Sequence, residues 1–358
     1  MGALFFIIAI LIALFPQNAI YGGMEALKTC ANVIIPSLFP FFICTRVIIK
    51  TPISDKTAKL LSSIMGPLFN LNGYSSIAFF SGILSGYPQG AKAVVTLYEE
   101  GKCTKTECER MLAFCNNSGP LFIIGAVGAG ILKSPALGHV LYIAHLLAAV
   151  TCGIIFRFYK RRDKNIFGKM DIFPKNKKTN FGIIFSESVS DSVITILIVC
   201  GYIVFMSVFL TLLEKIGAFF ILEKYIFQSS PFSKGIIRGF FEVSLGVKTL
   251  GSVGKLSLLK LFLIGLCIGW GGLSVHFQSL GLIKGKFSPK TYFIGKALSG
   301  LFTGLYSVLI LKIFPIAIKT SAGTYPDIKD TWQKSLALLA YYLVFMLSLR
   351  LISYIKEK

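Results

Sequence analysis

The chain has 358 residues, of which 54% are hydrophobic and 15% are charged, and its mean hydropathy is +0.72. Soluble globular chains are less apolar and carry more charge, so this composition excludes an ordinary soluble protein. The net charge of +21 could suit nucleic acid, but the basic residues lie in short loops between apolar windows, a pattern typical of membrane topology. We therefore predict a lipid bilayer as the protein's surroundings and no nucleic-acid partner.

Apolar windows long enough to cross a hydrocarbon core of about 30 Å recur along the chain. Backbone polar groups in lipid must bond within the chain, so these windows predict helices, and the lack of strand-like alternation argues against an outer-membrane barrel. The fold class is thus all-α, a polytopic membrane protein with about eight transmembrane helices. The predicted spans are residues 1–16, 28–49, 111–132, 136–156, 190–213, 255–283, 291–314 and 333–353.

Two further stretches, at residues 58–98 and 230–252, are apolar but broken, the first by several glycines and prolines. Glycine and proline at that density end helices. We therefore predict that both stretches form re-entrant hairpins, which enter the membrane and leave it on the same side.

Loop charge predicts the orientation. Residues 157–180 contain nine Lys or Arg residues against two Asp residues, which predicts a basic cytoplasmic linker. The first hairpin then enters from the cytoplasm and the second from the opposite side. The charged connector at residues 101–110 is predicted to be a solvated cytoplasmic loop.

The same count predicts two inverted repeats. Each half has one helix, one hairpin and two more helices, so two such units in series must be inverted relative to each other. A shared spacing supports the repeat, because Ser118 follows Lys92, and Ser274 follows Lys248, by 26 residues. The predicted domains are a first membrane repeat at 1–156, the linker at 157–180, and a second membrane repeat at 181–358.

The first candidate binding motif is Gly86–Lys92, in the first hairpin. Proline suits the first turn of a helix, and glycine lets the backbone approach a ligand, so a half-helix would begin near Pro88. Its free N–H groups would favour an anion, and Lys92 would add a full charge. The predicted binding residues here are Pro88, Gln89, Gly90 and Lys92. The alternative is a hairpin turn whose lysine reaches the cytoplasmic interface.

The second motif is Asn116-Asn117-Ser118-Gly119-Pro120, which interrupts an apolar window. Proline disfavours helical geometry at the residue before it, so we predict an unwound helix. Irregular backbone at membrane depth survives only inside protein or beside a wet cavity. Asn116, Asn117, Ser118 and Gly119 are therefore predicted to bind the solute. The alternative is that the membrane helix begins only at Pro120.

The matching interruption in the second half is Gly269–Gln278, whose polar members are Ser274, His276 and Gln278. A histidine in mid-span is a functional hypothesis by default and could carry a proton. The alternative is a neutral His bonded to a nearby carbonyl. At the second hairpin, Glu242 is predicted either to pair with Lys248 or to bind a coupling cation.

No catalytic pattern is present in the sequence. It lacks H-E-x-x-H, G-x-S-x-G and a Walker loop, so we predict no enzymatic activity. The eight cysteines contain no C-x-x-C pair and lie mostly in apolar runs, so no metal site is expected. No cofactor is predicted either.

Four motifs together resemble a known family: Pro36–Phe42, Gly86–Lys92, Asn116–Phe122 and Leu273–Gln278. They are similar to the YlbJ/SpoVV-type sporulation integral membrane proteins of the Gate group, whose "nucleoside recognition" label reflects distant similarity to concentrative nucleoside transporters. The resemblance covers most of the chain and is most specific in its first half.

The resemblance implies a transporter of a small anionic metabolite, dipicolinic acid, moved across the outer forespore membrane during sporulation. A dicarboxylate would fit the half-helix ends and lysines described above. The sequence leaves two alternatives open: a nucleoside as the solute, or a sporulation membrane scaffold that transports nothing. Assembly as a homo-oligomer is also compatible with the sequence.

Overall fold

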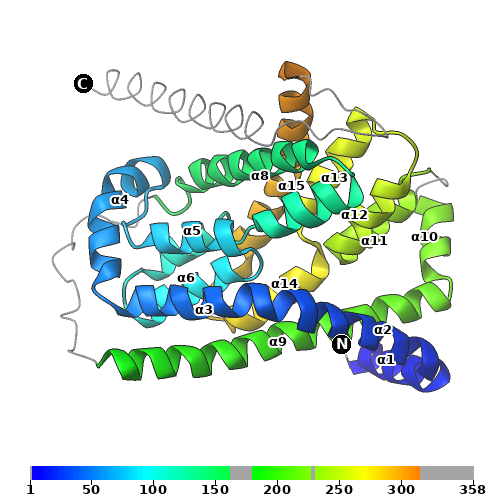
Figure 1. Ribbon diagram of the computed structural model, residues 1–358, viewed down its shortest axis with the longest axis horizontal. Coiled ribbons are helices and arrows are strands. Elements are labelled where there is room, and N and C mark those ends of the chain that lie inside the picture. The colour runs from blue at the N-terminus through cyan, green and yellow to red at the C-terminus, as the bar shows by residue number, and fades with distance from the viewer. Residues whose placement is uncertain (1, 162–179, 227–229, 315–358) are drawn as a thin grey trace.

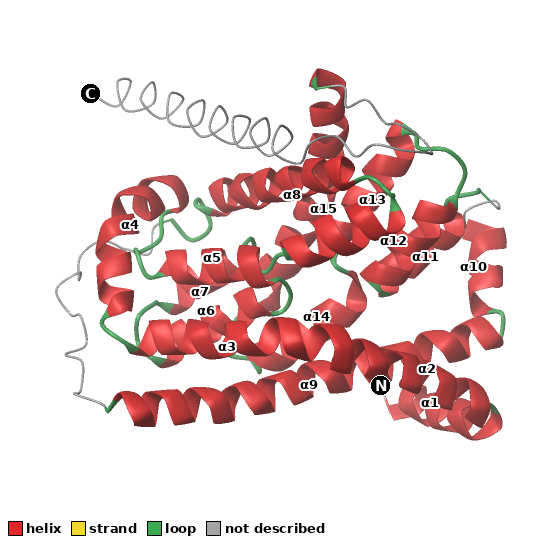
Figure 2. Ribbon diagram, in the orientation of Figure 1, coloured by secondary structure: helices red, strands yellow, loops and turns green. Residues whose placement is uncertain are grey.

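The computed structural model describes residues 2–161, 180–226 and 230–314. Every regular element in these ranges is a helix (Figure 2). The all-α fold class is therefore confirmed for the described part of the chain. The last predicted span, residues 333–353, lies outside it.

The first half of the chain begins with two helices joined at a sharp bend, continues in a further helix, and ends in a bundle of helices separated by non-helical segments (Figure 1). Pro16 begins α2, and the axis turns by 105° between α1 and α2. The elements in order are α1 (Gly2–Leu14), α2 (Pro16–Thr29), the π-helix η1 (Cys30–Ile34), α3 (Ile35–Lys50), α4 (Ile53–Phe69), α5 (Ser75–Ser85), α6 (Gln89–Glu99), α7 (Lys105–Leu112), the π-helix η2 (Leu121–Ile131) and α8 (Pro135–Phe156).

The second half repeats this kind of order, with a long helix, a short helix, a hairpin and a broken helix followed by a long one. The elements are α9 (Phe181–Lys215), α10 (Ala218–Ile226), α11 (Ser233–Phe241), α12 (Val243–Ser252), α13 (Leu258–Trp270), α14 (Gly272–Ile283) and α15 (Pro289–Ile313). The helices α4 and α10 stand at opposite ends of the bundle, across the direction of α3 and α9 (Figure 1).

Four described helical segments are long and apolar enough to cross a membrane if α13 and α14 are counted as one, or five if the bent pair α1–α2 also counts as one span. These four cover the predicted spans 136–156, 190–213, 255–283 and 291–314. The predicted span 111–132 is not one helix, because α7 ends at Leu112 and η2 begins at Leu121. The predicted count of eight spans is therefore not confirmed by the described residues.

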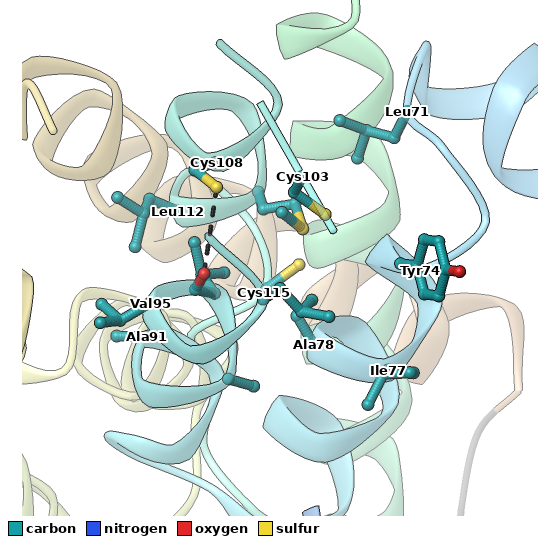
Figure 3. Close-up of a cluster of buried hydrophobic side chains, with 14 of the residues drawn as sticks. Leu71, Tyr74, Ile77, Ala78, Ala91, Val95, Cys103, Cys108, Leu112 and Cys115 are labelled. Carbon is teal, nitrogen blue, oxygen red and sulfur yellow. Dashed lines mark hydrogen bonds between the residues drawn. The ribbon is translucent and has the colours of Figure 1, made fainter. Parts of the chain in front are cut away.

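In each stretch predicted to be a hairpin, two helices pack against each other, α5 with α6 and α11 with α12; their re-entry into a membrane stays a prediction. The first is shorter than predicted, because residues 53–69 form the separate helix α4. Asn70 ends α4 in a left-handed conformation, with φ of 57°, and the chain turns there before α5 begins. The helices of the first hairpin pack on α7 through a buried apolar cluster that includes Ala78, Val95 and Leu112 (Figure 3).

The charged connector is not the solvated loop that the sequence suggested. Residues 105–112 form α7, and the side chains of Glu107, Glu109 and Arg110 are buried. Burial raises the pKa of Glu109, but hydrogen bonds from Lys160 and from the backbone N–H of Ser288 outweigh it, so this pKa lies below its usual range.

Backbone carbonyls satisfy the buried guanidinium. Arg110 donates to the carbonyl oxygens of Asn70 at 2.7 Å and Tyr159 at 2.8 Å. Because these partners are distant in the sequence, Arg110 joins the connector to the loop after α4 and to the residues that follow α8.

Close backbone approach fixes the first hairpin against the segment after α7. A Cβ atom on Gly82 would lie 1.7 Å from the carbonyl oxygen of Cys115, and one on Gly90 would lie 1.9 Å from the same oxygen. Neither position can hold a side chain without moving backbone, so both helices of the hairpin depend on glycine there.

We predict that Gly82→Ala lowers the thermal unfolding midpoint of the detergent-purified protein, because overpacking against backbone costs roughly 1–3 kcal/mol. Gly201→Ala is the matched control. Gly201 also lies inside a helix, α9, but a Cβ there would meet nothing within 4 Å. The control should be neutral or slightly stabilising, since alanine favours a helix over glycine by roughly 1 kcal/mol. Equal midpoints for the two variants would contradict the close approach.

Candidate functional site

Three interruptions of helical backbone meet inside the bundle. The first is the turn between α5 and α6, the second is the segment 113–120, and the third is the junction of α13 and α14. A Cβ on Gly86 would lie 2.9 Å from the backbone nitrogen of Gly119, and one on Gly271 would lie 3.1 Å from the ring of Tyr87. Gly86 and Gly271 also have φ of 100° and 86°, a conformation that favours glycine. The backbone is non-helical at residues 113–119, which agrees with the predicted break at Asn116–Pro120 and also with the alternative that the membrane helix begins only at Pro120.

Lys296 lies where these breaks meet. It is on α15, it is 1% exposed, and its Nζ donates to the hydroxyl of Tyr87 at 2.6 Å and the carbonyl oxygen of Asn116 at 3.0 Å. The Tyr87 hydroxyl in turn donates to the carbonyl oxygen of Ile268, at the end of α13. A single ammonium group therefore links the hairpin turn to the second break, and through Tyr87 to the third.

The sequence analysis missed Lys296, although a signal was present. It is an ionisable residue inside the apolar window 291–314, and such residues are functional candidates in membrane segments. Tyr87 stands inside the motif Gly86–Lys92 but was not singled out. Its role depends on α15, which no local pattern around Tyr87 reveals.

A second group of hydrogen bonds joins the predicted residues Asn116 and His276. The Nδ2 of Asn116 donates to the hydroxyl of Ser279 at 2.8 Å and lies 3.5 Å from the hydroxyl of Tyr292. His276 Nδ1 is 2.9 Å from that same hydroxyl. His276 is 1% exposed and also packs against Trp270, with ring centroids 4.2 Å apart. Residues from the first and second halves of the chain thus form one buried polar network.

Unsatisfied polar atoms gather around this network. Seven buried side-chain atoms of the described residues have no hydrogen-bond partner, although most such atoms in proteins are paired. Six of the seven belong to the first hairpin turn, the second break, α14 or α15. They are Ser85 Oγ, Gln89 Oε1, Asn116 Oδ1, His276 Nε2, Thr291 Oγ1 and Ser299 Oγ. Spare hydrogen-bonding capacity at this density suits a polar ligand.

Several other predicted residues form hydrogen bonds outside the network. The backbone N–H of Ser118 donates to His145 Nε2 at 3.0 Å, and Asn117 Nδ2 donates to the carbonyl oxygen of Phe114. Gln278 Nε2 donates to the hydroxyl of Ser274 at 3.3 Å. The hairpin turn places Pro88, Gln89 and Gly90 at the start of α6, where a Cβ on Gly90 would lie 2.9 Å from the Cα of Asn116.

The ammonium group of Lys92 forms an ion pair with a residue outside this network. Its ammonium group is 2.9 Å from Asp191 of α9, and Arg46 of α3 is also 2.9 Å from this carboxylate. Lys92 therefore ties the first hairpin to α9, and through Asp191 to Arg46 of α3. Within the described residues, no ion pair joins its ammonium group to the network around Lys296.

The two charged residues predicted at the second hairpin are also separate from the network. Glu242 caps α12, accepting a hydrogen bond from the backbone N–H of Leu245 at 2.7 Å. Lys248 is exposed, and no ion pair joins it to Glu242 in the described residues. The second hairpin still meets its own broken helix, because a Cβ on Gly272 would lie 3.0 Å from the Cα of Glu242.

We predict that Asp191→Asn destabilises the protein by roughly 1–3 kcal/mol, because Lys92 and Arg46 lose their shared carboxylate in a partly buried setting. Adding Lys92→Gln should recover part of the loss, since the two positions are coupled. Glu25→Gln is the control, because the Glu25–Lys28 pair is exposed and such pairs contribute little. Thermal unfolding in detergent measures all three, and a double variant no more stable than Asp191→Asn would contradict the coupling.

Comparison with known proteins agrees with this architecture. A family model described as "Gate: Nucleoside recognition" matches residues 31–153, which include the first hairpin and the second break. The chain is 30% identical over 322 residues to the sporulation integral membrane protein YlbJ of Bacillus subtilis (strain 168), covering 83% of this chain and 78% of that protein. No solved structure matches. The chain therefore belongs to the YlbJ family of sporulation integral membrane proteins and carries a Gate domain.

Proposed function

We propose that this protein is a membrane transporter of a small polar solute and not an enzyme. The observation that carries the proposal is the buried polar network at the junction of three backbone breaks. Broken helices at membrane depth are tolerated where they line a solute pathway, and secondary transporters build their binding sites from them. Buried polar atoms without partners at the same junction give a solute hydrogen bonds that the protein leaves unused.

We further propose two inverted repeats within about eight spans. Gly90 and Gly246, Lys92 and Lys248, and Ser118 and Ser274 are each separated by 156 positions. Contacts between the halves are reciprocal, since α6 touches α14 while α12 touches η2, and α7 touches α15 while α13 touches α8. The positions of α4 and α10 at opposite ends support opposite orientations of the two halves.

The proposed solute is a small anionic metabolite, dipicolinate, carried across the outer forespore membrane. Membership of a family of sporulation membrane proteins supports this setting. A buried cation at the junction supports an anion over a neutral molecule. A nucleoside is the second candidate, favoured by the description of the Gate family and by the amides of Asn116 and Gln278.

Topology is tested by cysteine labelling at the two ends of the bundle. The background is Cys44→Ser, because Cys44 is the exposed cysteine and the other seven are buried. In this background, Lys56→Cys on α4 and Lys215→Cys at the end of α9 are both at exposed positions. We expect an impermeant maleimide to label position 56 only from the cytoplasmic side and position 215 only from the opposite side. Labelling of both from one side would contradict the proposed orientation of the repeats.

Transport is tested by uptake into vesicles reconstituted with the purified protein. We expect accumulation of dipicolinate above the level of protein-free vesicles and little uptake of uridine, because the site holds an uncompensated cation. Uptake of uridine alone would favour the nucleoside. Uptake of neither would favour a membrane scaffold and remove the transport proposal.

The cellular role is tested by deleting the gene in its sporulating host. We expect spores with low dipicolinate while the mother cell still synthesises it, because the solute would not cross the outer forespore membrane. Dipicolinate is measured in spores and in whole sporulating cells. Normal dipicolinate in the spores of the deletion strain would overturn the assigned solute.

A further inference from the structure

The described buried cations differ in how their charge is balanced. Lys102 is 3.8 Å from the carboxylate of Asp55 and also donates to the hydroxyl of Ser54 and to the carbonyl oxygen of Ile49. Lys260 donates to three carbonyl oxygens at the end of α12 and in the loop after it, those of Gly251, Val253 and Gly254. Both ammonium groups thus have three partners for their three N–H bonds.

Lys296 is the exception among these buried lysines. Its three N–H bonds have only two acceptors among the described residues, the Tyr87 hydroxyl and the Asn116 carbonyl. As for Lys260, no carboxylate of the described residues forms an ion pair with it. A buried cation without a counter-charge is strongly unfavourable, so such groups are normally paired. The surroundings therefore favour an anion beside Lys296.

The neighbouring unsatisfied atoms define what else that anion would touch. Ser299 is three residues after Lys296 on α15, hence on the same face, and its Oγ has no partner. His276 Nε2 also has none. When the Tyr292 hydroxyl donates to His276 Nδ1, Nε2 carries the proton and becomes a donor.

We infer that Lys296 is the residue that selects an anionic solute, by binding its carboxylate group. The third N–H of Lys296 and the hydroxyl of Ser299 supply donors to the carboxylate oxygens, and His276 Nε2 supplies a further donor to the bound molecule. The inference rests on the proposed transport function and deepens it. It also transfers the role predicted for Lys92 and Lys248 to a lysine that the motifs did not include.

The test compares a carboxylate with its matched neutral amide. Binding of dipicolinate and of pyridine-2,6-dicarboxamide to the detergent-purified protein is measured by titration calorimetry, for the wild type and for Lys296→Met and Lys296→Gln. We expect the wild type to prefer the carboxylate. Both variants should weaken dipicolinate binding by roughly 10- to 100-fold, the effect of losing one hydrogen bond to a charged group, and change diamide binding little. Lys248→Gln, at an exposed position, should leave both ligands unaffected.

The outcomes separate this inference from the proposed function. Equal losses for the carboxylate and the diamide would show a structural role for Lys296 and overturn the inference, as would unchanged dipicolinate binding in a folded variant. If the wild-type protein binds dipicolinate no more tightly than the diamide, that result alone overturns the inference. If the wild type prefers dipicolinate but reconstituted vesicles do not take it up, transport fails while the binding role of Lys296 stands.

Discussion

The architecture depends on one constraint, which is that backbone N–H and C=O groups at membrane depth must find partners within the protein. Three helices stop inside the bundle, and each stop leaves such groups without helical partners. The chain meets the constraint by packing the stops together on glycine and by bringing polar side chains to them. His145 accepts from the N–H of Ser118, Tyr87 donates to the carbonyl of Ile268, and Lys296 donates to the carbonyl of Asn116. The polar site is therefore a consequence of how the broken backbone is satisfied.

Local sequence signals predicted where the helices break, but they did not predict which side chains surround the breaks in the folded chain. Glycine, proline and polar side chains within an apolar window predicted the interruption at Asn116–Pro120, because these residues oppose helical geometry through their own covalent structure. Lys296 lies in an unbroken helix, and its partners come from the first half of the chain, so no periodicity reveals them. The same reason explains the buried charges of α7. The sequence shows that Arg110 is charged, but the carbonyl groups that bind it, those of Asn70 and Tyr159, become its neighbours only in the folded chain.

The two halves share an order of elements but not their chemistry. The second break presents Asn116 and Ser118, whereas the third has two glycines, Gly271 and Gly272, with the capping residue Glu242 beside them. The spacing of 156 residues aligns Lys296 with Val140, an apolar residue of α8. At this junction the second half therefore contributes a buried cation, Lys296, whereas the position 156 residues earlier in the first half is apolar. A solute bound there would be held by different groups on its two sides.

That asymmetry has an energetic consequence for the empty and the occupied site. With the site empty, the positive charge of Lys296 is shared only by a phenol and a carbonyl, which are dipoles and cannot cancel it. A carboxylate at the same place would exchange its own hydration for an ammonium group and the donors of α14 and α15. The ammonium and carboxylate groups would then both lose their hydration, and each would compensate the charge of the other. This is the condition under which a buried ion pair is tolerated. A neutral solute would make the same hydrogen bonds but leave the charge uncompensated. On the role proposed for Lys296, discrimination between an acid and its amide would therefore arise from the missing counter-charge of this lysine.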